Sequence, residues 1–438
     1  MRSGELRDFA EPTPAYDARR FEGEVALFHV DAVGRRLADV RLGVGAGGRV
    51  PHVDVVHHDL EPVRAVETSD DHAARARLDD EVQTVRGAAE IGAHGVRRVV
   101  AGALPDGARF EIGFGARTGA ARGCARLYHV ATMKLTPSTF VWFNGELVPW
   151  DKAQVHVLTH ALHYGSAVFE GVRAYAAKGG TAVFGLREHV ERLFHSCKIV
   201  HLPLRWSQDE VEQAILDTVR ANKHDACYIR PLAYRGYGAL GVWPEECPVE
   251  LAIATFPWVK SNEQELIEKG IDVGVSSWRR MAPDTHPAMA KVAGNYVNSQ
   301  LVILEAKRHG YAEGIVLDVD GYLSEGSGQN LFLVQDGKLW TPPVGSSILA
   351  GITRRAVVEL ATDMGIAIVE QRLPRELLYT CDEMFFTGTV AEITPIRSVD
   401  GKPVGDGLRG PVTKRVQQRF FSIARGEIED RHAWLTRV

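Results

Sequence analysis

Several features that define special classes of protein are missing from this sequence. Among its 438 residues there are only five cysteines, with no CxxC pair and no short metal-ligand spacing: Cys124, Cys197, Cys227, Cys247 and Cys381. An odd, scattered set of thiols favours a reducing cytoplasm over secretion. No apolar run approaches the length of a membrane span, and the N-terminus lacks the apolar core of a signal peptide. These absences predict a cytoplasmic protein without a bound metal.

The sequence also lacks a strong charge of either sign. Its formal net charge is −5, which gives no reason to expect nucleic acid or an anionic membrane as a partner. Hydrophobic residues make up 45% and charged residues 24%, as in an ordinary globular protein. The length is sufficient for two or three domains with sizeable cores.

The first 132 residues lack three amino-acid types entirely. They contain no Lys, Asn or Trp, yet they carry 18 Arg, and the composition changes at Met133. We interpret residues 1–132 as a non-homologous N-terminal extension. Translation from a start codon assigned too early, or a disordered segment, would account for the bias. A genuine appended domain is the alternative, since short apolar runs are scattered through the segment.

From Met133 onward, periodic patterns predict alternating strands and helices. Phe140–Phe143 followed by Asn144-Gly145 indicates a strand entering a hairpin turn. The apolar residues of 187–197 recur at helical spacing, and a second helix is expected from Thr353 to a stop at Gly365. Further strands are predicted at 249–256, 271–276, 313–317 and 331–334.

Two charged residues stand in segments suited to one cofactor. Lys291 lies among small, apolar neighbours in Met289-Ala-Lys-Val-Ala-Gly-Asn-Tyr-Val-Asn-Ser299. Glu325 opens Glu325-Gly-Ser-Gly-Gln-Asn-Leu-Phe332, and Gly351-Ile-Thr353 follows. A pyridoxal phosphate protein needs a Schiff-base lysine, a charged partner for the pyridine nitrogen, and amide donors for the phosphate. Taken singly, Lys291 would be a surface charge and Glu325 an acidic turn residue, so the ordered set carries the inference.

That ordered set resembles the fold-type IV aminotransferases, and most closely the branched-chain amino acid aminotransferases. The resemblance covers about residues 138–438. It implies an α/β (α+β) fold with a small α/β domain at 133–258, a linker at 259–267 and a larger domain at 268–438 that binds pyridoxal 5'-phosphate. It also implies a homodimer or larger assembly.

The resemblance assigns cofactor contacts residue by residue. Lys291 is the Schiff-base lysine, Glu325 holds the pyridine nitrogen, and Tyr296 lies near the ring hydroxyl. The phosphate contacts are Arg192, Ile352, Thr353 and Thr389. Helical periodicity alone would place Arg192 in solvent, whereas the resemblance places it in a cofactor cleft. Simple capping of a helix is the alternative role for Thr353.

The substrate pocket must accept an aliphatic side chain and the glutamate γ-carboxylate in turn. The resemblance supplies an apolar wall from Tyr164, Phe169, Trp258 and Tyr296. Tyr228 and Arg230 alternate on one strand, so both should face the same side and form its polar end. The backbone amides of Val390 and Ala391 are expected to bind the substrate α-carboxylate.

The implied reaction is reversible transfer of the amino group of leucine, isoleucine or valine to 2-oxoglutarate, giving a 2-oxo acid and glutamate. Two alternatives share the fold: D-amino acid aminotransferase and aminodeoxychorismate lyase. The segments Tyr228-Ile-Arg-Pro231 and Phe256-Pro-Trp258 favour the branched-chain group. A non-catalytic relative that binds pyridoxal phosphate or phosphate is a third alternative, against which the intact Lys291 and Glu325 argue.

Overall fold

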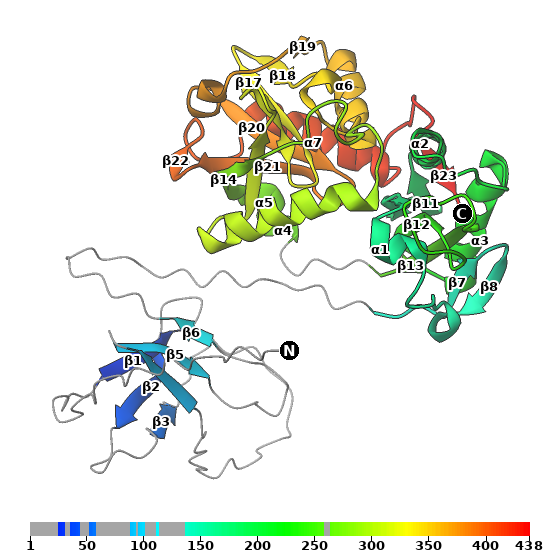
Figure 1. Ribbon diagram of the computed structural model, residues 1–438. Coiled ribbons are helices and arrows are strands. Elements are labelled where there is room, and N and C mark those ends of the chain that lie inside the picture. The colour runs from blue at the N-terminus through cyan, green and yellow to red at the C-terminus, as the bar shows by residue number, and fades with distance from the viewer. Residues whose placement is uncertain are drawn as a thin grey trace, which may run out of the picture. The chain divides into compact units, whose positions relative to one another are not determined.

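The computed structural model describes residues 136–257 and 263–438, together with the backbone of six strands nearer the N-terminus. Contacts divide the chain into two compact units, Met1–Arg126 and Leu127–Val438. The first unit contains two three-stranded antiparallel sheets, which are formed by β1 (Val25–Val30), β2 (Arg36–Gly43) and β3 (His52–His57), and by β4 (Ala88–Gly92), β5 (Gly95–Val100) and β6 (Glu111–Gly113). The second unit has a small half and a large half (Figure 1).

The small half is built on an eight-stranded sheet with the order β23-β11-β10-β12-β13-β7-β8, and β9 also pairs with β12. Its strands are β7 (Phe140–Phe143), β8 (Glu146–Pro149), β9 (Ala167–Phe169), β10 (Val172–Ala177), β11 (Gly180–Phe184), β12 (Cys227–Arg235), β13 (Val249–Phe256) and β23 (Leu435–Arg437). Asn144 and Gly145 join β7 to β8 with positive φ angles of 53° and 112°. The predicted hairpin turn is therefore confirmed.

Two long helices cover the small sheet: α2 (Leu186–Ile199) and α3 (Gln208–Asn222). The predicted apolar face of α2 is buried at Val190, Leu193 and Cys197. A capping box between Ser207 and Glu210 starts α3, because each side chain bonds the other residue's backbone N–H. The short α1 (His160–Tyr164) and a 3-10 turn, η1 (Trp150–Lys152), complete this half.

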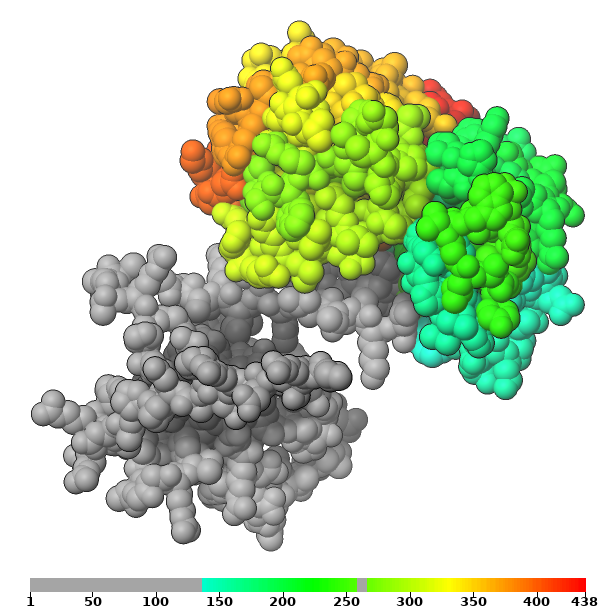
Figure 2. Space-filling model, in the orientation of Figure 1, coloured from blue at the N-terminus to red at the C-terminus, as the bar shows by residue number. Residues whose placement is uncertain are grey.

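The chain ends in the small half rather than in the large one. Strand β23 pairs antiparallel with β11, and Trp434 packs against Phe184 with ring centroids 5.5 Å apart. Figure 2 shows the two halves meeting along a seam, with C-terminal residues (red) beside it. The last residues therefore connect the large half back to the small sheet.

The large half contains a nine-stranded sheet with the order β16-β15-β14-β21-β20-β17-β18-β19, and β22 pairs with β21. The strands are β14 (Ile271–Arg279), β15 (Glu313–Leu317), β16 (Leu323–Gly326), β17 (Asn330–Gln335), β18 (Lys338–Thr341), β19 (Ile368–Glu370), β20 (Glu383–Gly388), β21 (Glu392–Val399) and β22 (Lys402–Pro403). An additional β16–β17 pairing, at Glu325 and Asn330, closes six of these strands into a ring.

Helices pack against this ring from several directions (Figure 1). Helix α5 (Tyr296–Arg308) contacts β14 and β15, whereas α6 (Ile352–Asp363) and α7 (Pro411–Ala424) contact β20 and each other. Helix α4 (Glu263–Lys269) occupies much of the range predicted as a linker. The shorter 3-10 turns are η2 (Ala293–Asn295), η3 (Val344–Ser346) and η4 (Arg375–Tyr379). Within the described ranges, no helix is long and apolar enough to cross a membrane.

Candidate active site

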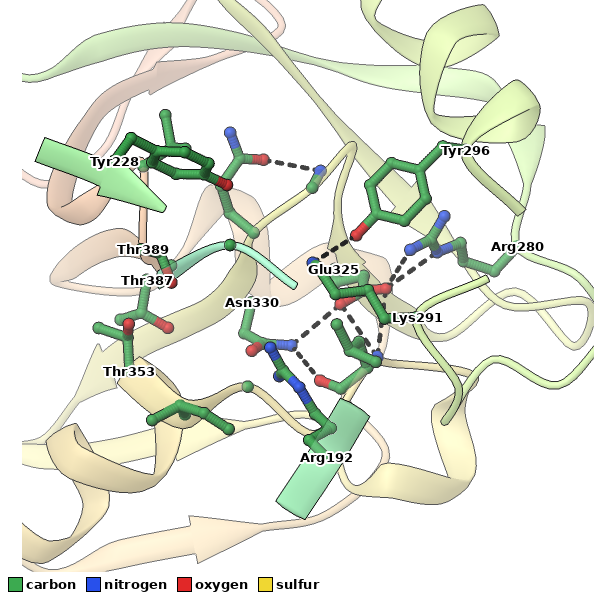
Figure 3. Close-up of a pocket in the computed structure, with 18 residues that line it drawn as sticks. Arg192, Tyr228, Arg280, Lys291, Tyr296, Glu325, Asn330, Thr353, Thr387 and Thr389 are labelled. Atoms are coloured by element: carbon green, nitrogen blue, oxygen red, sulfur yellow. Dashed lines mark hydrogen bonds and ion pairs between the residues drawn. The ribbon is translucent and has the colours of Figure 1, made fainter. Parts of the chain in front are cut away.

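A pocket with about 560 Å³ of open space lies where the two halves meet. Its walls bring together α2 and β12 from the small half with the β16–β17 turn, the start of α6 and the β20–β21 turn from the large half. In Figure 3, Lys291, Tyr296 and Arg280 lie across the pocket from Thr353, Thr387 and Thr389, with Glu325 and Asn330 between them. Polar groups of both signs therefore converge on one cavity.

Lys291 is fixed by contacts with the small half. Its backbone N–H donates to Ser196 Oγ on α2 at 3.0 Å, and its carbonyl accepts from the Phe169 N–H on β9 at 3.1 Å. Its Nζ lies 2.7 Å from the Tyr296 hydroxyl oxygen. Lys291 and Tyr296 are thus held side by side.

Glu325 is one of the most buried carboxylates of the site, with 2% of its surface exposed. Its Oε1 accepts from Nε of Arg280 at 3.0 Å, and Nη2 of the same residue contacts that oxygen. Its Oε2 accepts from Nδ2 of Asn330 at 2.9 Å. The Asn330 amide also donates to the Leu349 carbonyl at 2.8 Å, which joins the carboxylate to the loop before α6.

The N-terminus of α6 opens into the pocket without a side-chain cap. Gly351 is the N-cap residue and provides no side-chain hydrogen bond, and Ile352 and Thr353 form the first turn. Thr353 is inside the helix, so the alternative of capping by its hydroxyl is excluded. Uncapped amides and the helix dipole favour an anion at this position.

Arg192 belongs to a buried charge cluster beside that helix terminus. Its Nε donates to Glu170 Oε1 at 2.7 Å and its Nη2 to Oε2 at 2.8 Å, while Nη1 donates to the Ala350 carbonyl at 2.9 Å. Nδ1 of His189 donates to Glu170 Oε2 at 2.8 Å. The Arg192 side chain is 12% exposed and lines the pocket. Arg192 therefore faces a cleft rather than bulk solvent, as the resemblance implied.

The cluster fixes the protonation of its members. Burial disfavours the charged form of Glu170, but Arg192 and His189 outweigh it and hold the pKa of that carboxyl well below its usual range. Burial lowers the pKa of His189, although its hydrogen bond to Glu170 acts in the opposite direction. At neutral pH the cluster contains a charged Arg192–Glu170 pair and a neutral His189.

This cluster predicts a specific pH dependence of stability. A histidine whose pKa is lower in the folded than in the unfolded state makes folding less favourable as pH falls below about 6.5, because the unfolded chain takes up the proton first. We expect the difference in free energy of unfolding between wild type and His189→Gln to narrow as pH falls from about 7.5 to about 5. The change should be about 1.4 kcal/mol for each pKa unit by which His189 differs between the unfolded and folded states, as measured by urea unfolding of the cofactor-free protein.

The matched control is His195→Gln, because His195 is exposed on the same helix. This variant should show the same acid loss of stability as wild type. A gap between wild type and His189→Gln that stays constant over the pH range would show that His189 protonates normally in the folded protein.

The polar end of the pocket is formed on β12, and the predicted alternation is confirmed. Nη2 of Arg230 donates to the Tyr228 hydroxyl at 3.1 Å, so both side chains face the same side of the strand. The guanidinium carbon of Arg230 lies 4.7 Å from the Phe169 ring centroid. Its Nε is buried and finds no hydrogen-bond partner among the described residues. A spare buried donor of this kind suits a ligand carboxylate.

Backbone close to Tyr228 must be glycine. A Cβ on Gly171 would lie 2.0 Å from the Tyr228 hydroxyl oxygen, so any side chain there would displace the tyrosine.

The opposite turn, which contains Val390 and Ala391, is held by Glu392 at its end. Glu392 has a φ of 52°, and its Oε1 accepts from the Tyr175 hydroxyl at 2.9 Å. Nη1 of Arg173 lies 3.1 Å from the same oxygen. Two residues of the small half therefore anchor the turn.

Most of the residues predicted for the site line the pocket. These are Arg192, Tyr228, Lys291, Tyr296, Glu325, Ile352, Thr353, Thr389 and Val390. Phe169, Arg230 and Ala391 adjoin it through their neighbours, and Trp258 lies outside the described residues. Tyr164 differs: it does not line this chain's own pocket, it is 46% exposed, and its ring centroid lies 4.5 Å from that of His160.

The sequence did not single out Arg280, Asn330 or Thr387 as site residues, although all three line the pocket. Arg280 follows another arginine at the end of β14 and has no periodic or motif signal. Asn330 was noted only as part of a motif. Its register pairing with Glu325 was the one feature that could have identified it, and that pairing appears only in the folded ring.

Comparisons with known proteins agree with this geometry. The family model for amino-transferase class IV matches residues 167–399. The branched-chain-amino-acid aminotransferase of Escherichia coli K12 is 52% identical over 307 residues, which are 70% of this chain and 99% of that protein. The relative from Pseudomonas aeruginosa with the same name is 43% identical over 298 residues, covering 68% of this chain and 97% of that protein.

Solved structures of similar proteins agree as well. The crystal structure of the Escherichia coli branched-chain amino acid aminotransferase has a TM-score of 0.67 at 53% identity, covering 68% of this chain and 99% of that one. The branched-chain amino acid aminotransferase from Thermobaculum terrenum, solved in its PLP-bound holo-form, has a TM-score of 0.65 at 35% identity, covering 68% of this chain and 98% of that one. This chain belongs to the class IV, fold-type IV aminotransferases.

Proposed function

We propose that this protein is a branched-chain amino acid aminotransferase, which transfers the amino group of leucine, isoleucine or valine to 2-oxoglutarate. The observation that carries the proposal is that three groups line one pocket. They are the Lys291–Tyr296 pair, the buried Glu325, and the anion-binding groups formed by Arg192 and the N-terminus of α6. Relatives that this chain covers over 99% of their length bear the branched-chain name, which supports this reaction over D-amino acid transamination or aminodeoxychorismate cleavage.

The described residues fit pyridoxal phosphate. Arg192, the amides at Ile352 and Thr353, and the Thr389 hydroxyl would hold the phosphate, while Glu325 would hold the pyridine nitrogen. The Thr387 hydroxyl supports a ligand here, because it is buried with no partner among the described residues. When bound, the cofactor supplies an electron sink for the carbanion formed at the substrate α-carbon.

Lys291 performs two tasks in this proposal. Its Nζ would hold the cofactor covalently, and the same amine would serve as the general base that moves the α-proton of the substrate. The Tyr296 hydroxyl at 2.7 Å orients that amine. Backbone contacts with Ser196 and Phe169 keep the lysine in place while its amine is free, so the base stays within reach of the substrate.

The substrate would lie between β12, which carries Tyr228 and Arg230, and the turn that contains Val390 and Ala391. The amides of Val390 and Ala391 would receive the α-carboxylate, on the turn that Glu392 anchors. Phe169, Tyr296 and Trp258 would surround an aliphatic side chain. The spare Nε of Arg230 and the Tyr228 hydroxyl would receive the γ-carboxylate of glutamate in the return half-reaction.

The activity itself is tested by assay of the purified protein with single amino donors. Leucine, isoleucine and valine should each yield glutamate from 2-oxoglutarate, and the protein should absorb visible light from the bound cofactor. Activity with D-alanine and none with L-leucine would favour the D-amino acid alternative. Cofactor binding without turnover of any donor would favour the non-catalytic alternative.

The assembly we propose is a homodimer formed through an apolar face of the small half. Two contacting segments carry this face, residues 155–164 with α1 and residues 237–243. The His160 Nε2 atom lies 2.9 Å from the Gly241 carbonyl oxygen, and the centroids of the His156 and Tyr237 rings are 4.6 Å apart. The large hydrophobic residues exposed on these segments are Val155, Val157, Leu158, Leu162, Tyr164, Tyr237, Leu240, Val242 and Trp243. Monomers rarely expose so continuous an apolar surface.

We expect Val242→Asp to dissociate the dimer. Val242 is 88% exposed and stands beside Trp243, so a second copy would bury the new carboxylate without a partner. The dissociation constant should rise at least about 100-fold, as measured by sedimentation velocity. Leu408→Asp is the control, because Leu408 is 66% exposed elsewhere. A wild-type sedimentation profile for Val242→Asp would place the interface on another surface.

We also propose that the enzyme is complete without residues 1–132. The Escherichia coli relative is covered over 99% of its length by 307 residues of this chain, and the second compact unit contains the whole pocket. A chain that begins at Met133 should fold, bind the cofactor and match the specific activity of the full chain. Loss of assembly or activity would make the N-terminal unit a functional part.

The four buried free thiols of the described residues support a cytoplasmic location.

A further inference from the structure

Arg280 is a buried cation of the pocket to which the proposed reaction gives no task. Its backbone N–H donates to the Leu317 carbonyl of β15 at 2.9 Å, so the sheet fixes where the side chain begins. Its guanidinium contacts Glu325 Oε1 through two nitrogens, with Nε at 3.0 Å. Arg280 is 9% and Glu325 2% exposed. Both partners are therefore largely shielded from bulk solvent.

The rest of the guanidinium is held by α5. Its Nη1 donates to Asn298 Oδ1 at 3.2 Å and lies 3.4 Å from Ser299 Oγ. Helix α5 begins at Tyr296, the residue that contacts the Lys291 amine. Arg280 thus spans from the helix that carries Tyr296 to the carboxylate on β16, and Figure 3 shows it on the Lys291 side of Glu325.

The remaining contacts of Glu325 are with uncharged donors. Nδ2 of Asn330 donates to Oε2 at 2.9 Å, and the Leu349 backbone N–H lies 3.3 Å from the same oxygen. Arg280 is the only cation that forms an ion pair with Glu325 among the described residues. Arg280 therefore supplies the counter-charge for this buried carboxyl.

We propose that Arg280 is a positioning residue that holds the Glu325 carboxylate in a fixed orientation in the cofactor-free protein, ready for the pyridine nitrogen of the cofactor. Without Arg280 the buried Glu325 would lack its counter-charge, which is unfavourable for a buried ion. The two-nitrogen contact also restricts rotation of the carboxylate. The proposal rests on the role of Glu325 given above.

The coupling is tested first in the cofactor-free protein with a double-mutant cycle. Arg280→Met, Glu325→Gln and the double variant are compared by urea unfolding. Each single change leaves one buried group without its partner, whereas the double change removes both. We expect the double variant to lose less stability than the sum of the two single losses. Additive losses would overturn the coupling.

The second measurement follows the cofactor rather than activity. In Arg280→Met we expect the visible absorption of bound pyridoxal phosphate to shift and its dissociation constant to rise about tenfold. Arg280→Lys keeps the charge but loses the two-nitrogen geometry, so it should give an intermediate spectrum and remain interpretable if Arg280→Met folds poorly. A wild-type spectrum and affinity in both variants would reduce Arg280 to a structural residue and overturn the proposal.

Arg397→Met is the matched control. Arg397 contacts Asp272 of β14 through two nitrogens, at 2.8 and 2.6 Å, but neither residue lines the pocket. It should lower stability and leave the cofactor spectrum unchanged. Glu325→Gln separates the cofactor role of Glu325 from the positioning role of Arg280. An unchanged cofactor spectrum and affinity in Glu325→Gln would overturn the role of Glu325 and this proposal with it. An effect in Glu325→Gln that is absent from the Arg280 variants would overturn the positioning role alone.

Discussion

Replacing Lys291 with alanine should abolish transamination while leaving the fold intact. The lysine supplies both the amine for the covalent link and the base for the α-proton, and the described pocket contains no second lysine. Losing a nucleophile that is also the general base should lower turnover by on the order of 10⁴-fold or more. Multiple-turnover assays with leucine and 2-oxoglutarate measure this loss.

A covalent readout accompanies the rate measurement. Borohydride reduction of the wild-type holoenzyme should attach the cofactor to a peptide that contains Lys291, and the same treatment of Lys291→Ala should leave the protein unlabelled. Lys307→Ala is the matched control, because Lys307 is exposed on α5 and should keep both labelling and turnover. Turnover above trace level in Lys291→Ala would remove this lysine from the mechanism.

The reason that Lys291 could be found from the sequence is local. The lysine, the acid and the phosphate-binding helix start each lie in a short contiguous segment, and their order along the chain is enough to group them. Periodicity likewise predicted β13, β15 and α6, because these elements are long enough to bury a continuous apolar face. The site residues with neighbouring motif partners were therefore accessible to sequence reasoning.

The residues that escaped prediction depend on distant contacts. Arg280 meets Glu325 across 45 positions, and the contact forms because β14 and β16 both pair with β15. Strand β23, at the C-terminal end of the chain, pairs with the distant β11. It has only three residues, which is too short for a periodic signal of its own. Tyr164, which the resemblance places in the substrate pocket, is 46% exposed and does not line the pocket of its own chain.

Helical periodicity gave an incomplete answer for Arg192. The residue does lie opposite the apolar face of α2, but that side of the helix meets Glu170 and the Ala350 carbonyl instead of water. A polar helix face can therefore be buried when a charge cluster covers it, and only the partner residues distinguish the two cases. The glutamate that orients Arg192 was not separable from the sequence alone, since it lies on a loop between β9 and β10.

Replacing Arg230 with alanine should separate the two half-reactions. Its guanidinium faces Tyr228 and Phe169, and its buried Nε has no partner among the described residues, so it has capacity for a ligand carboxylate. A lost charge-assisted hydrogen bond costs about 1.5–3 kcal/mol, which lowers the single-turnover rate with glutamate by about 10- to 100-fold. Leucine has no γ-carboxylate, so its rate should fall by less than about threefold.

Two further variants make this result specific to the γ-carboxylate. Arg230→Lys keeps the charge without the planar fork and should fall between wild type and Arg230→Ala with glutamate. Arg205→Ala removes another arginine of the small half, one that stacks on Trp206 outside the pocket, and should leave both rates unchanged. Equal losses with glutamate and leucine in Arg230→Ala would mean that Arg230 binds the α-carboxylate common to both substrates. The glutamate-selective role would then have to come from another donor, and Tyr228, 3.1 Å from the guanidinium, is the next residue to test.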